Sequence, residues 1–266
     1  MNNGRGATYH WITLTTDYGL SDGFVGAVHG VLGQRAPGVR VLDVTHLVPP
    51  GDVARGAAVL AQTVPHLPTA VHVAVVDPGV GSLRRAIALE TPNGLFVGPD
   101  NGLLLGGAAA LGGVTRVVEL TNADWIGEAI SATFHGRDVF APVAARLATG
   151  ADLSEAGPEF DPAELVRLPD PVVTIADGVI EAEVVMVDRF GNVQLAATAE
   201  VLNGLPAELV VGGVHATKAS TFSDVPPGQL VVFADSAGKL ALAVNGGRAC
   251  VALSVLAGDL VRIASR

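Results

Sequence analysis

Cysteine is almost absent from this chain of 266 residues, which carries a single one, Cys250. One thiol excludes an intrachain disulfide and is typical of a reducing compartment, so we expect a cytoplasmic protein. Long apolar runs are missing too: 49% of the residues are apolar, but they form no run of the roughly 18 residues that a membrane span requires. The polar first ten residues lack the apolar segment of a signal peptide, and we expect residues 1–10 to be a flexible tail.

Basic residues are in the minority, with 16 Lys and Arg against 26 Asp and Glu and a net charge of −10. This excess of negative charge argues against a nucleic-acid partner and tolerates a cationic small substrate. The chain also lacks the Walker loop and the GxSxG, HExxH and paired CxxC motifs. Asp43, His46 and Asp52 match no standard spacing of metal ligands, so we expect neither a metal nor a cofactor.

The chain divides near residues 168–171 into two halves with different sequence patterns. In the first half, residues 11–168, strand-like and helix-like segments alternate, which predicts an α/β domain with a largely parallel sheet flanked by helices. The expected strands are 11–16, 39–44, 71–76 and 114–120, with a hairpin over 86–97 and helices over 24–34, 53–64 and 139–149.

The second half, residues 172–266, lacks long helical periodicity. Its short apolar runs are separated by Gly, Pro, Asn and Asp, a pattern that predicts a smaller all-β domain, either a barrel or a sandwich. The expected strands are 180–187, 209–211, 230–233, 240–244, 249–253 and 260–263.

The stretch VVDPGVGSLRR, residues 75–85, is the most informative part of the sequence. An apolar β-branched run ends on Asp77, a turn rich in Pro and Gly follows, and Arg84 returns seven residues later. Ligands of α/β proteins sit at the carboxyl ends of buried strands, and an arginine in contact would keep the aspartate ionised. The alternative is a turn aspartate beside a surface arginine pair.

Two more clusters of the first half fall at the ends of predicted elements. Asp17 follows the first strand, where its two oxygens suit two vicinal hydroxyls, or where it caps the next helix. His135 lies just before the helix predicted over 139–149, at an N-terminus whose dipole favours neutral imidazole. Asp138 is a plausible cap of that helix, and a purely structural histidine is the alternative at 135.

In the second half, Asp188, Phe190 and Asn192 lie together between two β segments. The Gly-Asn pair of this stretch is equally typical of an ordinary hairpin turn. Residues 235–238 and 245–247 carry turn signals as well, and each could likewise be part of a site or an ordinary turn.

Taken in order, the motifs TTDYG, DVTH, VPPGD, VVDPGVGSLRR, GPDNGLL, TFHGRDVFAPVAA and VDRFGN resemble one family. These are the S-adenosyl-L-methionine (SAM) hydrolases, or SAM hydroxide adenosyltransferases, whose superfamily includes the SAM-dependent fluorinase and chlorinase. The resemblance runs from about Ile12 to Ile263. It implies an N-terminal α/β domain and a C-terminal barrel-like domain. It also implies a homotrimer that binds SAM at the interface between subunits.

The same resemblance implies roles for individual residues. Asp77, Arg84 and His135 would hold and activate a water molecule, and Asp17 would bind the ribose hydroxyls. The implied methionine and adenine contacts are Asp188 to the ammonium, Ser236 to the carboxylate, Asn192 to the adenine edge, and Phe190 or Phe222 on the adenine face. Ala237 departs from the pattern, because the fluorinase has a methionine-binding arginine there.

The implied activity is hydrolysis of SAM to adenosine and L-methionine by attack of water on C5′. The halogenases have an uncharged residue where Asp77 stands, and the fluorinase has a halide-binding serine where Gly136 stands. A carboxylate beside the attacking atom would repel a halide. A chlorinase-type enzyme and a non-catalytic adenosine- or SAM-binding protein are the alternatives.

Overall fold

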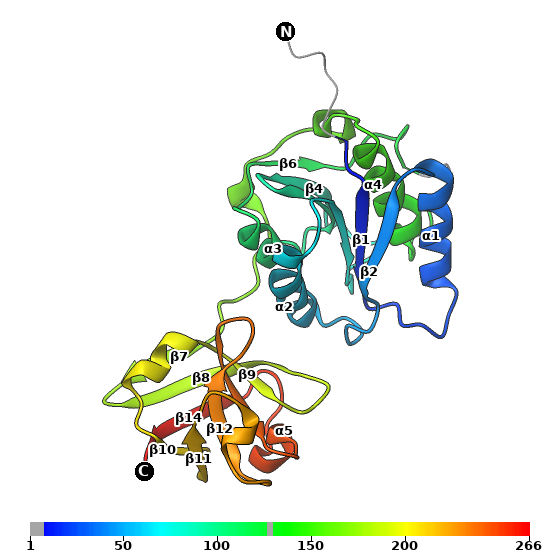
Figure 1. The fold of residues 1–266 in the computed structure, drawn as a ribbon. Coiled ribbons are helices and arrows are strands. Elements are labelled where there is room, and N and C mark those ends of the chain that lie inside the picture. Colours follow the sequence, from blue (N-terminus) through cyan, green and yellow to red (C-terminus); the bar gives the residue numbers. More distant parts are fainter. Residues whose placement is uncertain (1–7, 127–129) are drawn as a thin grey trace. The chain divides into compact units, whose positions relative to one another are not determined.

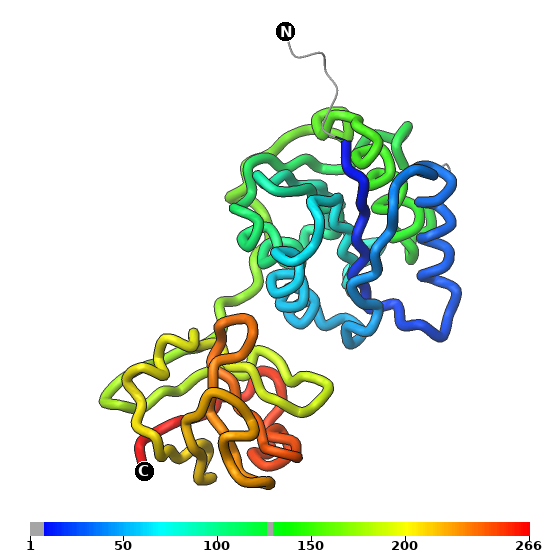
Figure 2. The backbone as a smooth tube through the Cα atoms, viewed as in Figure 1, coloured from blue at the N-terminus to red at the C-terminus, as the bar shows by residue number. Residues whose placement is uncertain are grey.

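The computed structural model describes residues 8–126 and 130–266. The chain divides into two compact units, Met1–Leu168 and Pro169–Arg266, each with its own hydrophobic core (Figures 1 and 2). Most of the expected tail, residues 1–7, lies outside the described residues, while Tyr9 packs against the first core and its amide donates to the carbonyl of Ala148. In the described part of the chain, no helix is long and apolar enough to cross a membrane.

The first unit is built on a six-stranded sheet with the order β2-β1-β3-β5-β4-β6. Its strands are β1 (Trp11–Thr16), β2 (Arg40–Thr45), β3 (Val71–Val75), β4 (Ala86–Thr91), β5 (Gly94–Pro99) and β6 (Arg116–Glu119). Strands β2, β1, β3 and β5 pair in parallel, and β4 runs antiparallel to β5 and β6. The largely parallel sheet predicted from the sequence is confirmed.

Helices cover both faces of this sheet (Figure 1). Helices α1 (Phe24–Arg35) and α4 (Ala141–Ala148) pack on one face, and α2 (Val53–Thr63) and α3 (Leu105–Ala110) pack on the other. Strand β3 shows why: Val71 and Val73 join the core beneath α1 and α4, while Ala74 joins the core beneath α2 and α3. A strand buried on both faces reads as a continuous apolar run, as this one does.

Short helical turns complete the first unit. They are η1 (Val64–His66), the π-helical turn η2 (Gly136–Phe140), η3 (Leu153–Ala156) and η4 (Pro162–Glu164). The helix expected over 139–149 therefore begins earlier, with η2 leading directly into α4. Asp138 lies inside η2 and not at its cap, a correction to the sequence interpretation. Its carboxylate accepts the amide of Ser131 and is paired with Arg137.

The second unit is a closed seven-stranded barrel, so the barrel alternative is confirmed and the sandwich is not. Its strands are β8 (Val179–Val187), β9 (Val193–Thr198), β10 (Glu208–Val211), β11 (Val214–Lys218), β12 (Leu230–Ala234), β13 (Lys239–Val244) and β14 (Leu260–Ser265), with β7 (Val173–Ala176) added beside β8. Pairing of β14 with β8 closes the barrel. Two short turns, η5 (Ala199–Gly204) and η6 (Phe222–Asp224), connect its strands.

One expected strand of this unit is wrong. Residues Ala249–Leu253 form a short helix, α5, with Ala249 buried against the barrel. Its amides bond locally or to the β8–β9 turn: Ala252 donates to the Arg248 carbonyl, and Cys250 to the Gly191 carbonyl. A five-residue apolar run has too little periodicity to separate a buried strand from a buried helix.

Candidate active site

The carboxyl edge of the first unit's sheet carries a cavity of about 240 Å³. Asp17 follows β1 and Asp77 comes two residues after β3. Because these strands are parallel neighbours, both carboxylates reach the same edge. Polar and aromatic groups of the lining include Asp17, Tyr18, Asp77, Thr133 and His135, and Gly136 also lines the cavity.

The Asp77 carboxylate is held by Arg84 across the loop between β3 and β4. The Arg84 Nε lies 3.1 Å from each carboxylate oxygen, and one terminal nitrogen lies 2.5 Å from Oδ2. Both side chains are buried, with exposed fractions of 5% for Asp77 and 11% for Arg84. A two-point contact of this kind fixes the plane of the carboxylate as well as its position.

The loop that brings Arg84 back is stiff. Ser82 donates its hydroxyl to the Gly79 carbonyl and accepts the amide of Arg84. Gly81 has a φ of +78°, and a Cβ added there would lie 2.5 Å from the Ala132 carbonyl oxygen. Only glycine satisfies both conditions. The sequence between Asp77 and Arg84 therefore specifies the turn.

His135 completes the trio, since its Nδ1 lies 2.8 Å from a terminal nitrogen of Arg84. A guanidinium only donates hydrogen bonds, so Nδ1 is the acceptor, and the neutral ring carries its proton on Nε2. Burial, and next the positive charge of Arg84, lower the pKa of His135 from its ordinary value. The imidazole is therefore neutral at pH 7. Arg84 also lies 5.3 Å from the ring centre of Phe140.

Tyr18 is a member of the cavity that the sequence interpretation did not single out. A Cβ at Gly136 would lie 2.0 Å from the Tyr18 hydroxyl, so the hydroxyl occupies the place of a side chain at position 136. The Tyr18 ring makes an edge contact with Phe134. Burial, followed by the charges of Asp17 and Asp77, raises the pKa of Tyr18, which keeps its phenol protonated. The sequence feature that could have identified Tyr18 is its position directly after Asp17 in the motif TTDYG.

Asp17 lies at the rim of this cavity, where one oxygen is already used. Its Oδ2 accepts the amide of Gly51 at 2.9 Å, and Gly51 has a φ of +74°. Among the described residues, none donates to Oδ1. The helix-capping alternative does not hold, because Gly23 precedes α1 and no side chain caps that helix. The carboxylate keeps acceptor capacity for a ligand hydroxyl.

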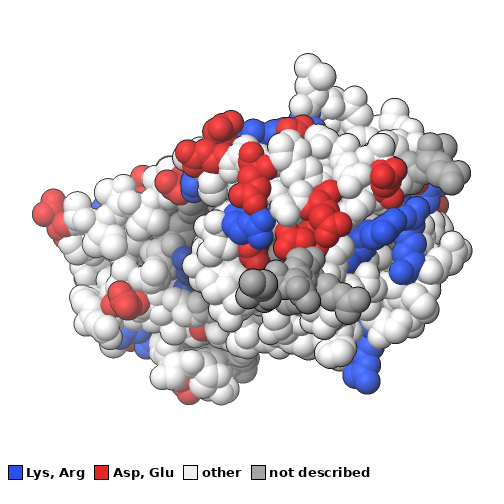
Figure 3. Space-filling view, turned by 90° about the horizontal axis from the view of Figure 1, so that it is seen from above, with Lys and Arg blue, Asp and Glu red and all other residues white. Residues whose placement is uncertain are grey.

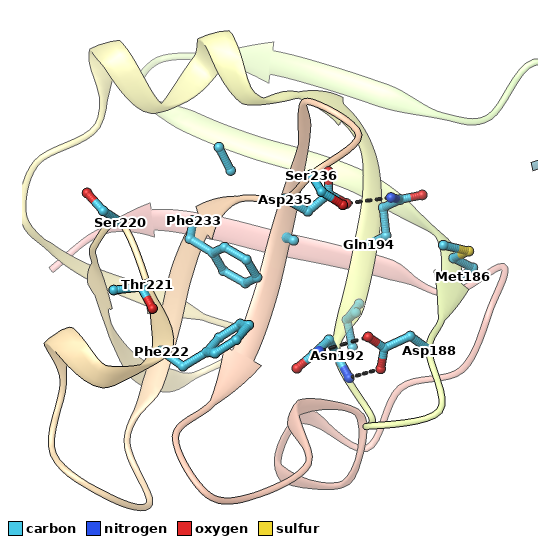
Figure 4. A pocket seen from close by; sticks show the side chains of 13 residues that line it. Met186, Asp188, Asn192, Gln194, Ser220, Thr221, Phe222, Phe233, Asp235 and Ser236 are labelled. Atoms are coloured by element: carbon cyan, nitrogen blue, oxygen red, sulfur yellow. Dashed lines mark hydrogen bonds between the residues drawn. The ribbon is translucent and has the colours of Figure 1, made fainter. Parts of the chain in front are cut away.

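The second unit has a cavity of its own, of about 290 Å³, shown in Figure 4. Its polar and aromatic lining includes Asp188, Asn192, Gln194, Phe222, Asp235 and Ser236. The rings of Phe222 and Phe233 meet edge to face, with centroids 5.2 Å apart. The Asp235 carboxylate accepts a hydrogen bond from the Gln194 side chain (Figure 4).

Most of the hydrogen-bonding capacity of Asp188 goes into its own turn. Its Oδ1 accepts the amides of Phe190 and Asn192, and its Oδ2 accepts the side-chain amide of Asn192. This fixes the Asn192 side chain with its carbonyl oxygen left as an acceptor for a ligand. Gly191 has a φ of +86°, which agrees with the hairpin-turn alternative for this stretch.

The structure thus distributes the sequence-predicted residues over two cavities. Asp17, Asp77 and His135 line the first, with Arg84 in contact with the last two. Asp188, Asn192, Phe222 and Ser236 line the second. Phe190 does not line either cavity within the described ranges and is 75% exposed. Gln194 and Phe233 were missed because they lie within strands β9 and β12 without a distinctive motif, and Asp235 was noted only as part of a turn signal.

Charge on the surface is mixed. On the face shown in Figure 3, acidic and basic side chains form small groups of both signs. Arg116, for example, lies within 4.0 Å of carboxylates of Glu90, Asp152 and Glu159. On this face, mixed groups of this kind do not provide the broad basic surface that a phosphate backbone requires.

An α/β unit with a partly buried Asp–Arg–His trio, joined to a β-barrel with an aromatic pocket, defines a two-domain protein with sites for a small molecule. The sequence matches the SAM hydroxide adenosyltransferase N-terminal domain over residues 12–157 and the SAM hydroxide adenosyltransferase C-terminal domain over residues 182–262. The chain therefore belongs to the SAM hydroxide adenosyltransferase family.

Individual relatives agree with this assignment. The chain is 65% identical to an (R)-S-adenosyl-L-methionine hydrolase of Salinispora arenicola, covering 97% of this chain and 98% of the relative. A fluorinase from an Actinoplanes species is 27% identical over 95% of this chain and 96% of its own. The crystal structure of an uncharacterized conserved protein from Thermotoga maritima superposes with a TM-score of 0.87 at 36% identity, covering 95% of this chain and 99% of that one.

Proposed function

We propose that this protein hydrolyses (R)-S-adenosyl-L-methionine to adenosine and L-methionine. The observation that carries the proposal is the contact of both Asp77 and His135 with one guanidinium, that of Arg84. Relatives at up to 65% identity over nearly the whole chain carry the name of this hydrolase. An ionised carboxylate beside the reacting atom favours water over a halide as the nucleophile, which weighs against the fluorinase reaction.

In the proposed step, the oxygen of a water molecule attacks C5′ in line with the sulfur. The C–O bond forms as the C5′–S bond breaks, and the bonding pair passes to sulfur, so the sulfonium leaves as the neutral thioether of methionine. This leaving group needs no proton and no metal. The difficulty is the weak nucleophile, and holding it in line with C5′ removes several kcal/mol of the barrier.

The proton released by the water goes to Asp77 in this proposal. The Nδ1 atom of His135 already accepts from Arg84, and its Nε2 atom carries a proton, so the neutral ring has no site for another. The water oxygen becomes strongly acidic only as the C–O bond forms, so a carboxylate suffices to accept its proton. Arg84 is then a positioning residue. The Nε2–H group of His135 donates a hydrogen bond to the water.

The remaining contacts of the proposal divide between the two cavities. Asp17 binds the ribose hydroxyls through its available oxygen. In the barrel unit, Asn192 meets the adenine edge and Phe222 its face, with Phe190 as a further candidate. Asp188 and Ser236 face the ammonium and carboxylate of methionine. Ala237 supplies no cation for that carboxylate, and its amide already donates to Asp235 Oδ1, so the Ser236 hydroxyl is the donor in this proposal.

We further propose a homotrimer in which one subunit's α/β unit and its neighbour's barrel unit share each SAM molecule. Ligand pockets that enclose a molecule of this size have volumes of about 300–1,000 Å³. The cavities of about 240 and 290 Å³ each fall below that range, and each supplies a different set of contacts. A cytoplasmic location agrees with the single cysteine.

Incubation of the protein with SAM, followed by chromatography of the nucleoside product, tests the activity. The expected products are adenosine and methionine, and in H₂¹⁸O the label enters the adenosine 5′-hydroxyl. With high chloride, formation of 5′-chloro-5′-deoxyadenosine would instead identify a chlorinase-type enzyme. Tight binding in calorimetry with SAM left intact over hours would identify a binding protein without activity.

A further inference from the structure

A second cluster of ligating side chains lies outside the cavity described above. It consists of His29 on α1, Asp43 on β2 and His46 directly after β2. One oxygen, Asp43 Oδ1, lies 2.9 Å from His29 Nε2 and 3.1 Å from His46 Nε2. The three ligating atoms all lie within 4.8 Å of one another. The sequence interpretation considered Asp43 and His46 with Asp52, but Asp52 instead caps α2 by accepting the Arg55 amide.

His46 provides a second and independent observation. Its side chain is only 4% exposed, and its Nε2 atom has no hydrogen-bond partner among the described residues. The 3.1 Å approach to Asp43 Oδ1 is close, but it lacks the direction of a hydrogen bond. A buried polar nitrogen without a partner costs free energy unless something else binds it. This nitrogen faces the shared oxygen of the cluster.

The spacing of the atoms suits a metal ion. Zinc binds imidazole nitrogen and carboxylate oxygen at about 2.0–2.2 Å, so two ligands of a tetrahedral ion lie roughly 3.3 Å apart. The two nitrogen–oxygen separations are close to that value, and the two imidazole nitrogens, which lie within 4.8 Å of each other, would reach it by rotation of the side chains. The side chains of His29 and Asp43 are 36% and 42% exposed, so an ion can enter and keep water as its remaining ligand.

The surroundings of His46 also suit a ligand histidine. Metal-binding histidines commonly hydrogen-bond through the second ring nitrogen, which fixes the ring. Here the Nδ1 atom of His46 lies 2.9 Å from the Thr16 hydroxyl. That hydroxyl can accept a hydrogen bond from the Nδ1–H group when Nε2 binds the ion.

We propose that His29, Asp43 and His46 bind a divalent transition-metal ion such as Zn²⁺ through two imidazole nitrogens and one carboxylate oxygen. The ion would be structural and would take no part in the reaction at C5′. His46 connects the site to the strand end that carries Asp17: the Thr16 hydroxyl also accepts the Tyr18 amide, and the His46 carbonyl accepts the Gly19 amide. A bound ion would hold this segment in place.

Calorimetric titration of Zn²⁺ into the full-length, tag-free protein, previously stripped with EDTA, tests the proposal. We expect one saturable site per chain. The substitutions His29→Ala and Asp43→Asn should each weaken it by at least roughly tenfold, the lower end of what even an outer-shell partner contributes. Because His29 is on the surface of α1, the His29→Ala variant should keep its circular dichroism spectrum. Co²⁺ should give visible absorption bands that both substitutions abolish.

His215→Ala is the matched control. His215 is also an exposed histidine paired with a carboxylate, that of Glu208, at 2.6 Å, but the described residues place no second histidine there. Its loss should leave Zn²⁺ binding unchanged. The proposal is wrong if no saturable binding occurs, if His29→Ala and Asp43→Asn bind as the parent does, or if His215→Ala abolishes binding. The readout is metal binding, so failure of SAM turnover would not affect it.

Discussion

The guanidinium of Arg84 donates to Nδ1 of His135 across 2.8 Å while it also holds the Asp77 carboxylate. One positive charge thus sets the position of an acid and the tautomer of an imidazole. A proton on Nδ1 would face the guanidinium, and two donors with like charge would then oppose each other. The arrangement holds together only while His135 is neutral.

The activity should therefore fall at acidic pH through protonation of His135. Burial and the charge of Arg84 lower its pKa below 6.5, so the ring is neutral at pH 7 and gains a proton only as the pH falls below that lowered value. We expect kcat to decrease there, with a midpoint below 6.5. The pH profile of kcat measures this. His135→Asn should lose this limb of the profile, and an unchanged acid limb in that variant would contradict the assignment.

Replacing Asp77 with Asn should remove most of the turnover and little of the binding. The amide keeps the shape of the side chain but cannot take a proton from water, and loss of a general base costs roughly 10²–10⁴-fold in rate. We expect kcat to fall within that range while the Kd for SAM changes little. Asp22→Asn, an exposed carboxylate of the same unit, is the control and should keep full activity. Equal losses in both variants would exclude a specific role.

Asp17→Asn should have the opposite effect and weaken SAM binding more than it lowers turnover. The amide oxygen can still accept the Gly51 amide, but the charged acceptor for the ribose is lost. Hydrogen bonds to charged groups contribute about 1.5–3 kcal/mol, so KM should rise roughly 10- to 150-fold with a smaller change in kcat. A SAM analogue without the 2′-hydroxyl sharpens the test. It should bind the parent protein less well than SAM does, and Asp17→Asn should discriminate less between the two.

The Asp77–Arg84 contact was predictable because both ends of it lie in one stretch. A β-branched run that stops on an acid, followed seven residues later by an arginine, specifies a strand end and a returning loop. His135 lies 51 residues beyond Arg84, so its place beside them depends on how α4 packs on the sheet. Spacing alone does not encode this, and only the family resemblance indicated it.

There are also physical reasons why the sequence did not predict some elements. Helix α3 has the sequence LGGAAA, in which glycine obscures helical periodicity, and it is stabilised by packing against α2. Helix α5 is a short apolar run whose pattern also fits a strand. The cluster of His29, Asp43 and His46 joins helix α1 to strand β2 and the residue after it, and only the tertiary fold brings its members together.

Gly136→Ala should destabilise the protein through the Tyr18 hydroxyl. The added Cβ would lie 2.0 Å from that oxygen, and overpacking of this kind typically costs about 1–3 kcal/mol. Removing the hydroxyl in Tyr18→Phe should relieve most of the clash. Denaturant unfolding of the two single variants and the double variant gives the coupling, which we expect to be favourable by about 1 kcal/mol or more. Additive effects would mean that the ring moves aside.

His72 is buried on β3 with an exposed fraction of 1%. Burial lowers its pKa from 6.5 to about 4 in the folded protein. Between these values the unfolded chain binds a proton that the folded chain does not, so stability is complete above pH 6.5 and falls as the pH decreases toward 4. The shift corresponds to a loss of about 3 kcal/mol over that interval.

Urea unfolding at several pH values between 7 and 4 measures this loss. His72→Gln should remove the corresponding part of the slope, because glutamine does not titrate and its amide can still meet the Thr13 hydroxyl that now lies 2.9 Å from Nδ1. His10→Gln serves as the matched control, because His10 is an exposed histidine of the same unit. If His72→Gln and the parent lose stability in parallel, other groups are responsible for the acid sensitivity of the fold.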